Sequence, residues 1–237
     1  MPQPRKLQDE FFRKAKAEGF AARSAYKLLE LHEKKNLIRR GDRVLDLGCA
    51  PGSWLQAAER IMGETGMILG VDLQEVRIAL GPTVRVERAD AFTLDLSPFL
   101  ADLGGMCRFD VVLSDMAPNT SGHGDDFLSV RLCRRVLEFL PKALRPGGRL
   151  LMKVLEGEEF PQLLKETKAM FIEAGATKPR ASREVSRETF IWGLGFLEDR
   201  AVDVQRPNPR SAGHSQSGAV PDGASGPVHT PGSVAGP

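Results

Sequence analysis

The chain has 237 residues, of which 41% are hydrophobic, 27% charged and 6% aromatic. That profile is typical of a globular protein with one domain, or with one domain and a tail. No apolar run approaches the roughly 18–20 residues that a membrane span needs, and residues 1–15 lack the apolar core of a secretory signal. The three cysteines, Cys49, Cys107 and Cys133, are odd in number and widely spaced, which argues against a disulfide framework or a zinc site. We therefore expect a cytoplasmic protein without a bound metal.

The net charge of +2 hides an asymmetry along the chain. Residues 1–43 contain twelve Lys or Arg and six Asp or Glu, so this arm carries +6 and the rest of the chain −4. A basic arm on a nearly neutral body is typical of a protein that binds a polyanion. Charge alone leaves a second interpretation open, which is an ordinary solvated helix face.

Two helices are expected in the arm, over Asp9–Glu18 and Ser24–Lys35, with Ser24 as the N-cap of the second. From Arg43 to about Asp199, short β-rich runs alternate with helical patterns. The expected strands are Arg43–Leu47, Met67–Val71, Val84–Arg88, Phe109–Ser114, Gly148–Val154 and Thr189–Phe196. The expected helices are Ser53–Met62, Phe127–Leu144 and Phe160–Ala174. This alternation predicts an α/β fold with a parallel sheet covered on both faces.

The last part of the chain differs in composition from the rest. Residues 207–237 contain six Pro, six Gly and five Ser, and no aromatic residue, Leu, Ile or Met. Such a segment cannot bury enough apolar surface to offset its chain entropy. We therefore divide the chain into a basic helical arm (residues 1–40) that belongs to the main domain, a core (41–200) and a disordered tail (205–237).

The first predicted strand runs into the small-residue loop Asp46-Leu-Gly-Cys-Ala-Pro-Gly52, which Ser53 and a helix follow. Small residues after the first strand of an α/β sheet let a ligand approach the backbone. The loop lacks the Gly-x-Gly-x-x-Gly pattern of dinucleotide sites and the Gly-Lys-Ser/Thr ending of a P-loop. It suits a nucleoside that carries an amino-acid chain, although a tight turn without a ligand is the alternative.

Two further acids strengthen the cofactor hypothesis. Asp72 closes the second strand, where a carboxylate can accept hydrogen bonds from ribose hydroxyls, and Asp90 follows the third strand, within reach of an adenine amino group. Each acid alone is more typical of a loop or helix cap. Together they look like ligands of S-adenosylmethionine. Trp54, one turn into the next helix, either walls this site or packs in the core.

Polar residues also interrupt the later strands. The fourth strand ends in Ser114-Asp-Met-Ala-Pro-Asn119, which places the Asp115 carboxylate at the mouth of the cofactor crevice. Lys153 lies in an otherwise apolar run, where an unpaired charge is rare, unless it reaches out from a strand edge. Glu188 precedes the last strand and would be unremarkable alone.

Together these motifs make the sequence resemble the FtsJ-like ribosomal RNA 2′-O-methyltransferase family, over nearly everything except the tail. The motifs that carry the resemblance are Arg23-Ser-Ala-Tyr-Lys-Leu28, Asp46 to Gly52, Ser114 to Asn119, Met152-Lys153 and Ser186-Arg-Glu188. The sequence departs from the family pattern at Cys49 and Ser53, where relatives usually carry Ala and Gly.

The resemblance implies a Rossmann-like methyltransferase fold with a seven-stranded, mostly parallel sheet. It implies S-adenosylmethionine as cofactor, with cofactor-binding residues Gly52, Trp54, Asp72, Asp90 and Asp115, and a catalytic tetrad of Lys27, Asp115, Lys153 and Glu188. The implied substrate is a uridine 2′-hydroxyl in the A-loop of 23S rRNA, within the large ribosomal subunit. We also expect a monomer that does not bind membranes.

General chemistry agrees with a base role for Lys153. A free lysine is protonated at neutral pH, so this role requires that burial and the second ammonium group of Lys27 favour the neutral amine. Asp115 opposes that effect but can orient the amine, and Glu188 would position the ribose or Lys27. Alignment of the reactants would supply much of the acceleration.

The basic residues of the arm would hold phosphates without reading sequence. They are Arg5, Lys6, Arg13, Lys14, Lys16 and Arg23, and a second cluster comprises Lys178, Arg180, Arg183 and Arg187. Phe11, Phe12 and Tyr26 could stack on bases, although helix packing is the stronger interpretation for the two phenylalanines.

Other classes of protein fit the sequence less well. The chain lacks the Asp-Pro-Pro-aromatic turn of amino-methyltransferases, a Cys nucleophile for carbon-5 methylation, and cap-binding elements. The missing Gly-x-Gly-x-x-Gly pattern argues against a nicotinamide oxidoreductase. A non-catalytic RNA-binding ribosome-assembly factor that keeps the fold remains the main alternative.

Overall fold

The computed structural model describes residues 4–102, 108–118, 124–182 and 186–204. The predicted disordered tail, residues 205–237, lies outside this part of the chain, and so do Cys107 and Arg183. No described helix is long and apolar enough to cross a membrane.

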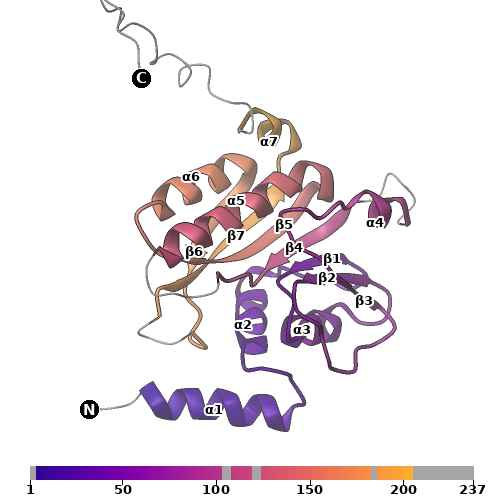
Figure 1. Cartoon of the computed structure of the whole chain (residues 1–237), viewed down its shortest axis with the longest axis vertical. Helices are drawn as coiled ribbons and strands as arrows, with labels where there is room; N and C mark the ends of the chain where they lie inside the picture. Colours follow the sequence, from indigo (N-terminus) through magenta and orange to yellow (C-terminus); the bar gives the residue numbers. More distant parts are fainter. Residues whose placement is uncertain (1–3, 103–107, 119–123, 183–185, 205–237) are drawn as a thin grey trace, which may run out of the picture. The chain divides into compact units, whose positions relative to one another are not determined.

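Within the described residues, seven strands form one sheet in the order β3-β2-β1-β4-β5-β7-β6 (Figure 1). Neighbours from β3 to β5 pair in parallel, whereas β7 runs antiparallel to both β5 and β6. The prediction of an α/β fold with a mostly parallel seven-stranded sheet is therefore confirmed. The strands are β1 (Arg43–Leu47), β2 (Met67–Asp72), β3 (Val84–Arg88), β4 (Phe109–Ser114), β5 (Leu144–Leu155), β6 (Phe171–Thr177) and β7 (Glu188–Phe196).

Helices cover both faces of the sheet, because consecutive residues of its central strands point to opposite sides and most of them are apolar. On β4, Val112 packs into a cluster with α5 and α6, whereas Val111 and Leu113 pack into a second cluster with α2 and α3. The helices of the two faces are α2 (Ala25–Lys35) and α3 (Ser53–Met62) on one side, and α5 (Asp125–Ala143), α6 (Phe160–Met170) and α7 (Glu198–Val204) on the other.

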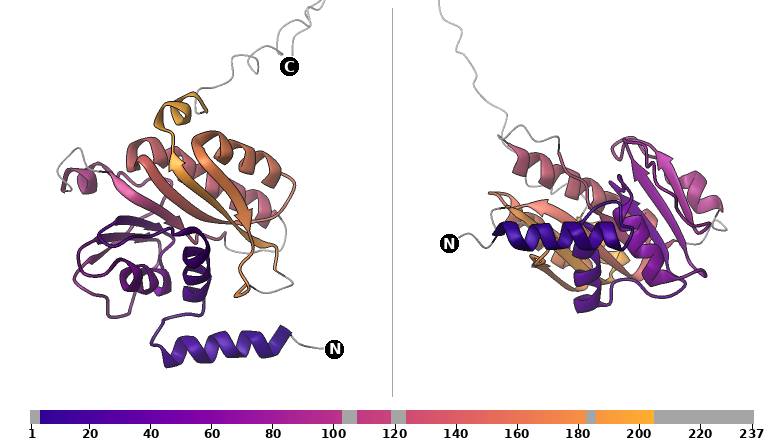
Figure 2. Two further views of the ribbon diagram at one scale, coloured as in Figure 1. Left: turned by 180° about the vertical axis from the view of Figure 1, so that it is seen from behind. Right: turned by 90° about the horizontal axis from the view of Figure 1, so that it is seen from below.

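Two helices lie outside these layers. The short α4 (Ser97–Asp102) follows β3, and α1 (Pro4–Ala17) lies beyond α2 as seen from the sheet (Figure 2). The contact of α1 with α2 includes the rings of Phe11 and Tyr26, whose centroids are 5.5 Å apart. Phe12 is 63% exposed. The expected helix packing is therefore found for Phe11 but not for Phe12.

The largest error of the sequence analysis concerns the helix expected over Phe160–Ala174. Helix α6 ends at Met170, and the next residues form β6, which pairs with β7. The ring of Phe171 lies over Gly193 of β7, so the chain leaves the helix in order to complete the sheet. Such a long-range pairing overrides the helical pattern of the local sequence.

Ser24 also differs from expectation, because it does not act as the N-cap of α2. It precedes α2, but its φ and ψ angles of −61° and −19° are helical and its side chain makes no capping hydrogen bond. Its Oγ lies 2.7 Å from Oγ of Ser53, the first residue of α3. The hydroxyl therefore ties the start of α2 to the start of α3 and does not cap its own helix.

Candidate active site

A cavity of about 510 Å³ opens where the parallel strands end. Because β1, β2, β4 and β5 run in the same direction, the loops that follow them meet at one edge of the sheet. The cavity is lined by residues from each of these ends, among them Gly48, Asp72, Asp90, Asp115 and Lys153. The sheet thus gathers polar groups that are more than a hundred positions apart in sequence.

The loop after β1 forms one wall of the cavity. Gly48 has a φ of +79°, and a Cβ at this position would lie 2.8 Å from the backbone nitrogen of Met116. The loops after β1 and β4 therefore contact each other through bare backbone. Gly52 has a φ of +110°, and a Cβ there would approach Ile78 Cδ1 to 2.5 Å. Both glycines are required by geometry.

The two acids expected to hold a nucleoside are fixed by main-chain donors. Asp72 accepts hydrogen bonds from the N–H of Ala50 at 2.9 Å and from the N–H of Gln74 at 2.8 Å. Asp90 accepts one from the N–H of Phe92 at 2.9 Å. Both side chains line the cavity, so each carboxylate shapes its own loop and faces the site.

Sequence analysis assigned no role to Asp46, which the structure places behind the site. It is fully buried on β1, and neither carboxylate oxygen has a hydrogen-bond partner in the described part of the chain. Burial raises the pKa of Asp46 well above its usual value, and the charges of Asp115 and Asp72 add to this effect. The neutral acid is therefore favoured. An acid in the apolar run Val44 to Leu47 was the available signal.

Trp54 does not line the cavity, and its side chain lies in the core with 2% exposure. Its Nε1–H donates to the carbonyl of Ser24 at 2.9 Å, and its ring packs against Phe190 with centroids 5.9 Å apart. The sequence left open whether Trp54 walls the cavity or packs in the core, and the structure shows that its side chain packs in the core. It links the start of α2, the helix that carries Lys27, to the loop after β1.

We expect Trp54→Phe to destabilise the fold by about 1–2 kcal/mol, because the partly buried carbonyl of Ser24 would lose its donor. Urea unfolding would measure the loss. A free energy of unfolding equal to that of the unmodified protein would contradict a structural role for this hydrogen bond.

Lys153 and Asp115 meet at the mouth of the cavity. The Lys153 Nζ lies 2.9 Å from Asp115 Oδ1 and donates a hydrogen bond to the Asp115 carbonyl at 2.7 Å. The two side chains are only 10% and 18% exposed. The carbonyl of Lys153 itself accepts a hydrogen bond from the Cys133 thiol, whose pKa burial raises to about 12. Contacts of its main-chain carbonyl and of its side-chain amine thus both fix the position of Lys153.

A second pair completes the cluster. Lys27 of α2 donates to Glu188 Oε1 at 2.6 Å, and the same oxygen lies 4.0 Å from the Lys153 Nζ. Glu188 is in place because β7 is antiparallel, which brings its first residue opposite Leu155 at the end of β5. The structure therefore brings all four predicted tetrad residues together, with two amines sharing one carboxylate oxygen.

The structure brings only some of the predicted cofactor-binding residues to the cavity. Asp72, Asp90 and Asp115 line the cavity, whereas Gly52 and Trp54 lie beside it at the start of α3. Sequence reasoning missed Leu73 and Phe92, which also line the cavity and are 61% and 39% exposed. Among the described residues, no group of three or more His, Cys, Asp or Glu could hold a metal ion.

Comparison with known proteins gives a consistent result. A family model described as FtsJ-like methyltransferase matches residues 20–196. Ribosomal RNA large subunit methyltransferase E of Syntrophobacter fumaroxidans is 43% identical over 190 residues, covering 79% of this chain and 95% of that protein. The protein of the same name from Methanothrix thermoacetophila is 43% identical over 196 residues, covering 81% and 74% respectively.

A solved structure has a similar fold. A crystal structure described as a ribosomal RNA methyltransferase from Plasmodium falciparum matches with a TM-score of 0.67 at 27% identity, covering 75% of this chain and 99% of that one. The fold and the position of the cavity define a Rossmann-like methyltransferase. More narrowly, the chain belongs to the FtsJ-like methyltransferase family.

Proposed function

We propose that the protein is an RNA ribose 2′-O-methyltransferase that uses S-adenosylmethionine and acts in the cytoplasm as a monomer. The substrate would be a uridine 2′-hydroxyl in the A-loop of 23S rRNA, within the large ribosomal subunit. The observation that carries the proposal is the pairing of Lys153 with Asp115 at the mouth of the cavity. The names of the relatives, which refer to large-subunit ribosomal RNA, support this class of substrate.

The residues around the cavity fit the cofactor. When bound, S-adenosylmethionine supplies a methyl group on a positively charged sulfur. Asp72 would accept hydrogen bonds from its ribose hydroxyls and Asp90 from its adenine amino group. Gly48 lets the loops after β1 and β4 close this wall of the cavity, since a Cβ there would lie 2.7 Å from Cγ of Met116. Asp115 adds a carboxylate at the mouth of the same cavity.

Gly52 and Trp54 would act through their main chain, at the start of α3. The first N–H groups of a helix have no acceptor within it, and they bind carboxylates well. Gly52 occupies the N-cap position of α3, and Trp54 is its second residue. The carboxylate of the cofactor's amino-acid chain would be held at this helix end.

Lys153 would remove the proton of the ribose 2′-hydroxyl as that oxygen attacks the methyl group. The proton would pass to the Lys153 Nζ, which must be neutral beforehand and becomes an ammonium group afterwards. The contacts with Asp115 keep the amine at the mouth of the cavity. Lys27 and Glu188 would set the charge around this amine and hold the ribose. General-base catalysis of this kind contributes about 10²–10⁴-fold, and alignment supplies the rest.

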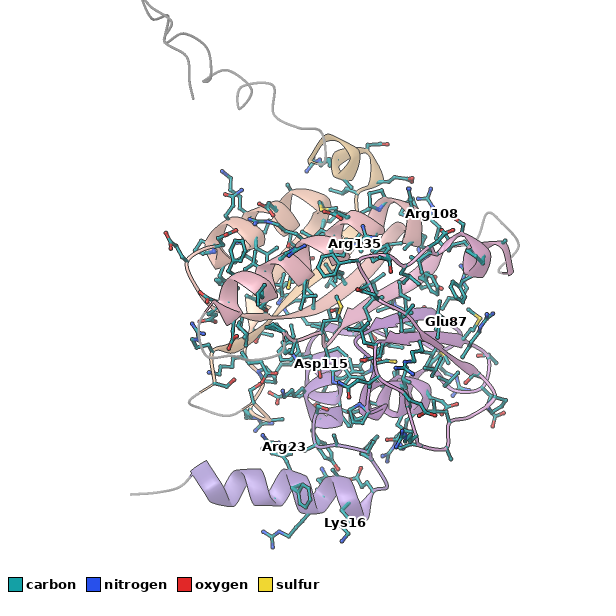
Figure 3. The ribbon with its side chains drawn as sticks, viewed as in Figure 1. Lys16, Arg23, Glu87, Arg108, Asp115 and Arg135 are labelled. Atoms are coloured by element: carbon teal, nitrogen blue, oxygen red, sulfur yellow. The ribbon has the colours of Figure 1, made fainter. Side chains whose placement is uncertain are left out.

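Basic residues of the arm would hold the phosphates of the RNA. Lys14 and Lys16 lie on α1, and Lys14 is 54% exposed on its side chain. Figure 3 shows Lys16 pointing away from the body of the molecule and Arg23 between α1 and Asp115. In the second cluster, Arg180 and Arg187 are 82% and 53% exposed on their side chains. These groups would position RNA without reading its sequence.

Replacing Asp72 with alanine should weaken binding of S-adenosylmethionine by about 10–100-fold, because charged hydrogen bonds contribute about 1.5–3 kcal/mol each. The substitution would leave both the ribose hydroxyls and the N–H groups that shape the loop without this acceptor. Calorimetric titration would measure the affinity, with Asp95→Ala, an exposed loop acid, as control. An affinity like that of the unmodified protein would show that the nucleoside lies elsewhere.

Methyl transfer from labelled S-adenosylmethionine would test the function directly. The assay would offer large ribosomal subunits that lack the A-loop methyl group, beside naked 23S rRNA, and nuclease digestion would locate the label. We expect label on a 2′-O-methyluridine. Cofactor binding without label on either RNA would overturn the proposal and favour a non-catalytic assembly factor.

A further inference from the structure

Large apolar side chains are exposed beside the catalytic cluster, at the start of α5. Phe127 is 57% exposed and Leu128 is 39% exposed, although both belong to the first turns of a helix that is otherwise packed on the sheet. Phe127 is not needed for the core, and the proposed chemistry does not use it. An exposed aromatic ring beside an active site is a candidate for contact with substrate.

The position of this turn is fixed by contacts with the catalytic strand. Ser129 Oγ accepts a hydrogen bond from the N–H of Leu155, two residues after Lys153. On the other side, Asp126 Oδ1 lies 3.9 Å from Nη1 of Arg187, the residue before Glu188. The first turn of α5 is thus adjacent to the ends of both strands that carry the catalytic cluster.

The exposed surface continues into the cofactor cavity. Residues four apart lie on one face of a helix, so Phe127 is followed by Arg131, and Leu128 by Leu132. Leu132 lines the cavity, and the Arg131 guanidinium lies 5.0 Å from the ring centroid of Phe92, which also lines it. We call Phe92, Phe127, Leu128 and Arg131 the mouth strip.

From this arrangement we infer that the mouth strip binds an unpaired nucleotide next to the target nucleotide, with its base stacked on Phe127. The inference rests on the proposed function and names how that site holds its RNA. Rings and guanidinium planes are the surfaces on which unpaired RNA bases stack. Arg131 and Arg187 would supply positive charge for the adjoining phosphates. An apolar peptide would gain less from two arginines than a nucleotide does.

A fluorescent oligonucleotide tests the stacking. The probe is a single-stranded RNA with 2-aminopurine next to a uridine, because stacking quenches the fluorescence of that base. We expect Phe127→Ala to lose the quenching and to bind the probe about tenfold more weakly. Phe127→Trp should retain both properties. Phe127→Leu should lose the quenching, since leucine is apolar but has no ring.

A matched control comes from Ile172, which is 72% exposed on β6. Ile172→Ala removes a similar exposed apolar surface from a strand that does not line the cavity, and it should change neither quenching nor affinity. Thermal unfolding and the affinity for S-adenosylmethionine should be the same in all variants. Probe binding by Phe127→Ala or Phe127→Leu that equals that of the unmodified protein would overturn the inference.

The two proposals fail in different ways. If the unmodified protein methylates ribosomal RNA but Phe127→Ala does so with the same kcat/KM, the stacking inference is wrong and the proposed function stands. If the unmodified protein transfers no methyl group but binds the probe through Phe127, the proposed function is wrong and the nucleotide-binding surface stands.

Discussion

Replacing Lys153 with arginine should lower the methyl-transfer rate by about 10²–10⁴-fold, the usual contribution of a general base. Arginine keeps the positive charge beside Asp115 but stays protonated at any pH that the protein tolerates, so it cannot accept the proton of the 2′-hydroxyl. The ion pair at 2.9 Å gives the new side chain a partner, which should preserve the fold. Single-turnover transfer from labelled S-adenosylmethionine would measure the rate.

Two controls make this result specific. Cofactor affinity should stay within about twofold, because the arginine keeps the charge that Lys153 places at the cavity. Lys165→Arg, at an exposed position of α6, should leave the rate unchanged. A Lys153→Arg protein with substantial turnover would mean that alignment alone drives the reaction and that Lys153 is not the base.

The second large effect is expected at Lys27. Lys27→Met leaves Glu188, whose side chain is 12% exposed, without its partner at 2.6 Å and with the Lys153 amine at 4.0 Å. The unpaired carboxylate would attract this amine and draw it away from Asp115 and the mouth of the cavity. We expect a loss of methyl transfer of about a hundredfold, because a small displacement of a catalytic group can cost that much.

A double variant separates this charge effect from a loss of packing. Breaking a buried ion pair on one side costs about 3–5 kcal/mol of stability, whereas removing both charges costs much less. Lys27→Met combined with Glu188→Gln should therefore recover most of the stability and part of the methyl-transfer rate. Urea unfolding and single-turnover transfer would measure both. A double variant as slow as Lys27→Met would contradict electrostatic coupling between Glu188 and Lys153.

The local sequence was sufficient for the parallel half of the molecule. Strands β1 to β4 and helix α3 follow the expected ranges closely. The apolar runs of β1, β2 and β4 are buried on both faces, whereas β3 alternates apolar and charged residues. The same logic groups Asp72 and Asp115 at the cavity, since the carboxyl ends of parallel strands meet at one edge. These residues could be grouped before any coordinates were known.

The antiparallel part depended on pairing that no local pattern contains. The expected helix continued to Ala174, but Phe171–Thr177 is a strand, because it completes the sheet beside β7. The direction of β7 decides that Glu188 reaches Lys27 and Lys153; a parallel strand would have carried it to the opposite edge. Only the resemblance to a family had suggested this residue.

By itself, the sequence determined the α/β class, the small-residue loop after β1, the acids at the strand ends and the basic arm, because these depend on residue type and short spacing. Only the tertiary structure decided that the Trp54 side chain is buried against Phe190, that burial raises the pKa of Asp46, and that Phe127 is exposed beside the cluster. Those properties depend on which neighbours exclude water from a side chain. Long-range packing sets these neighbours, and the order of residues along the chain does not specify them.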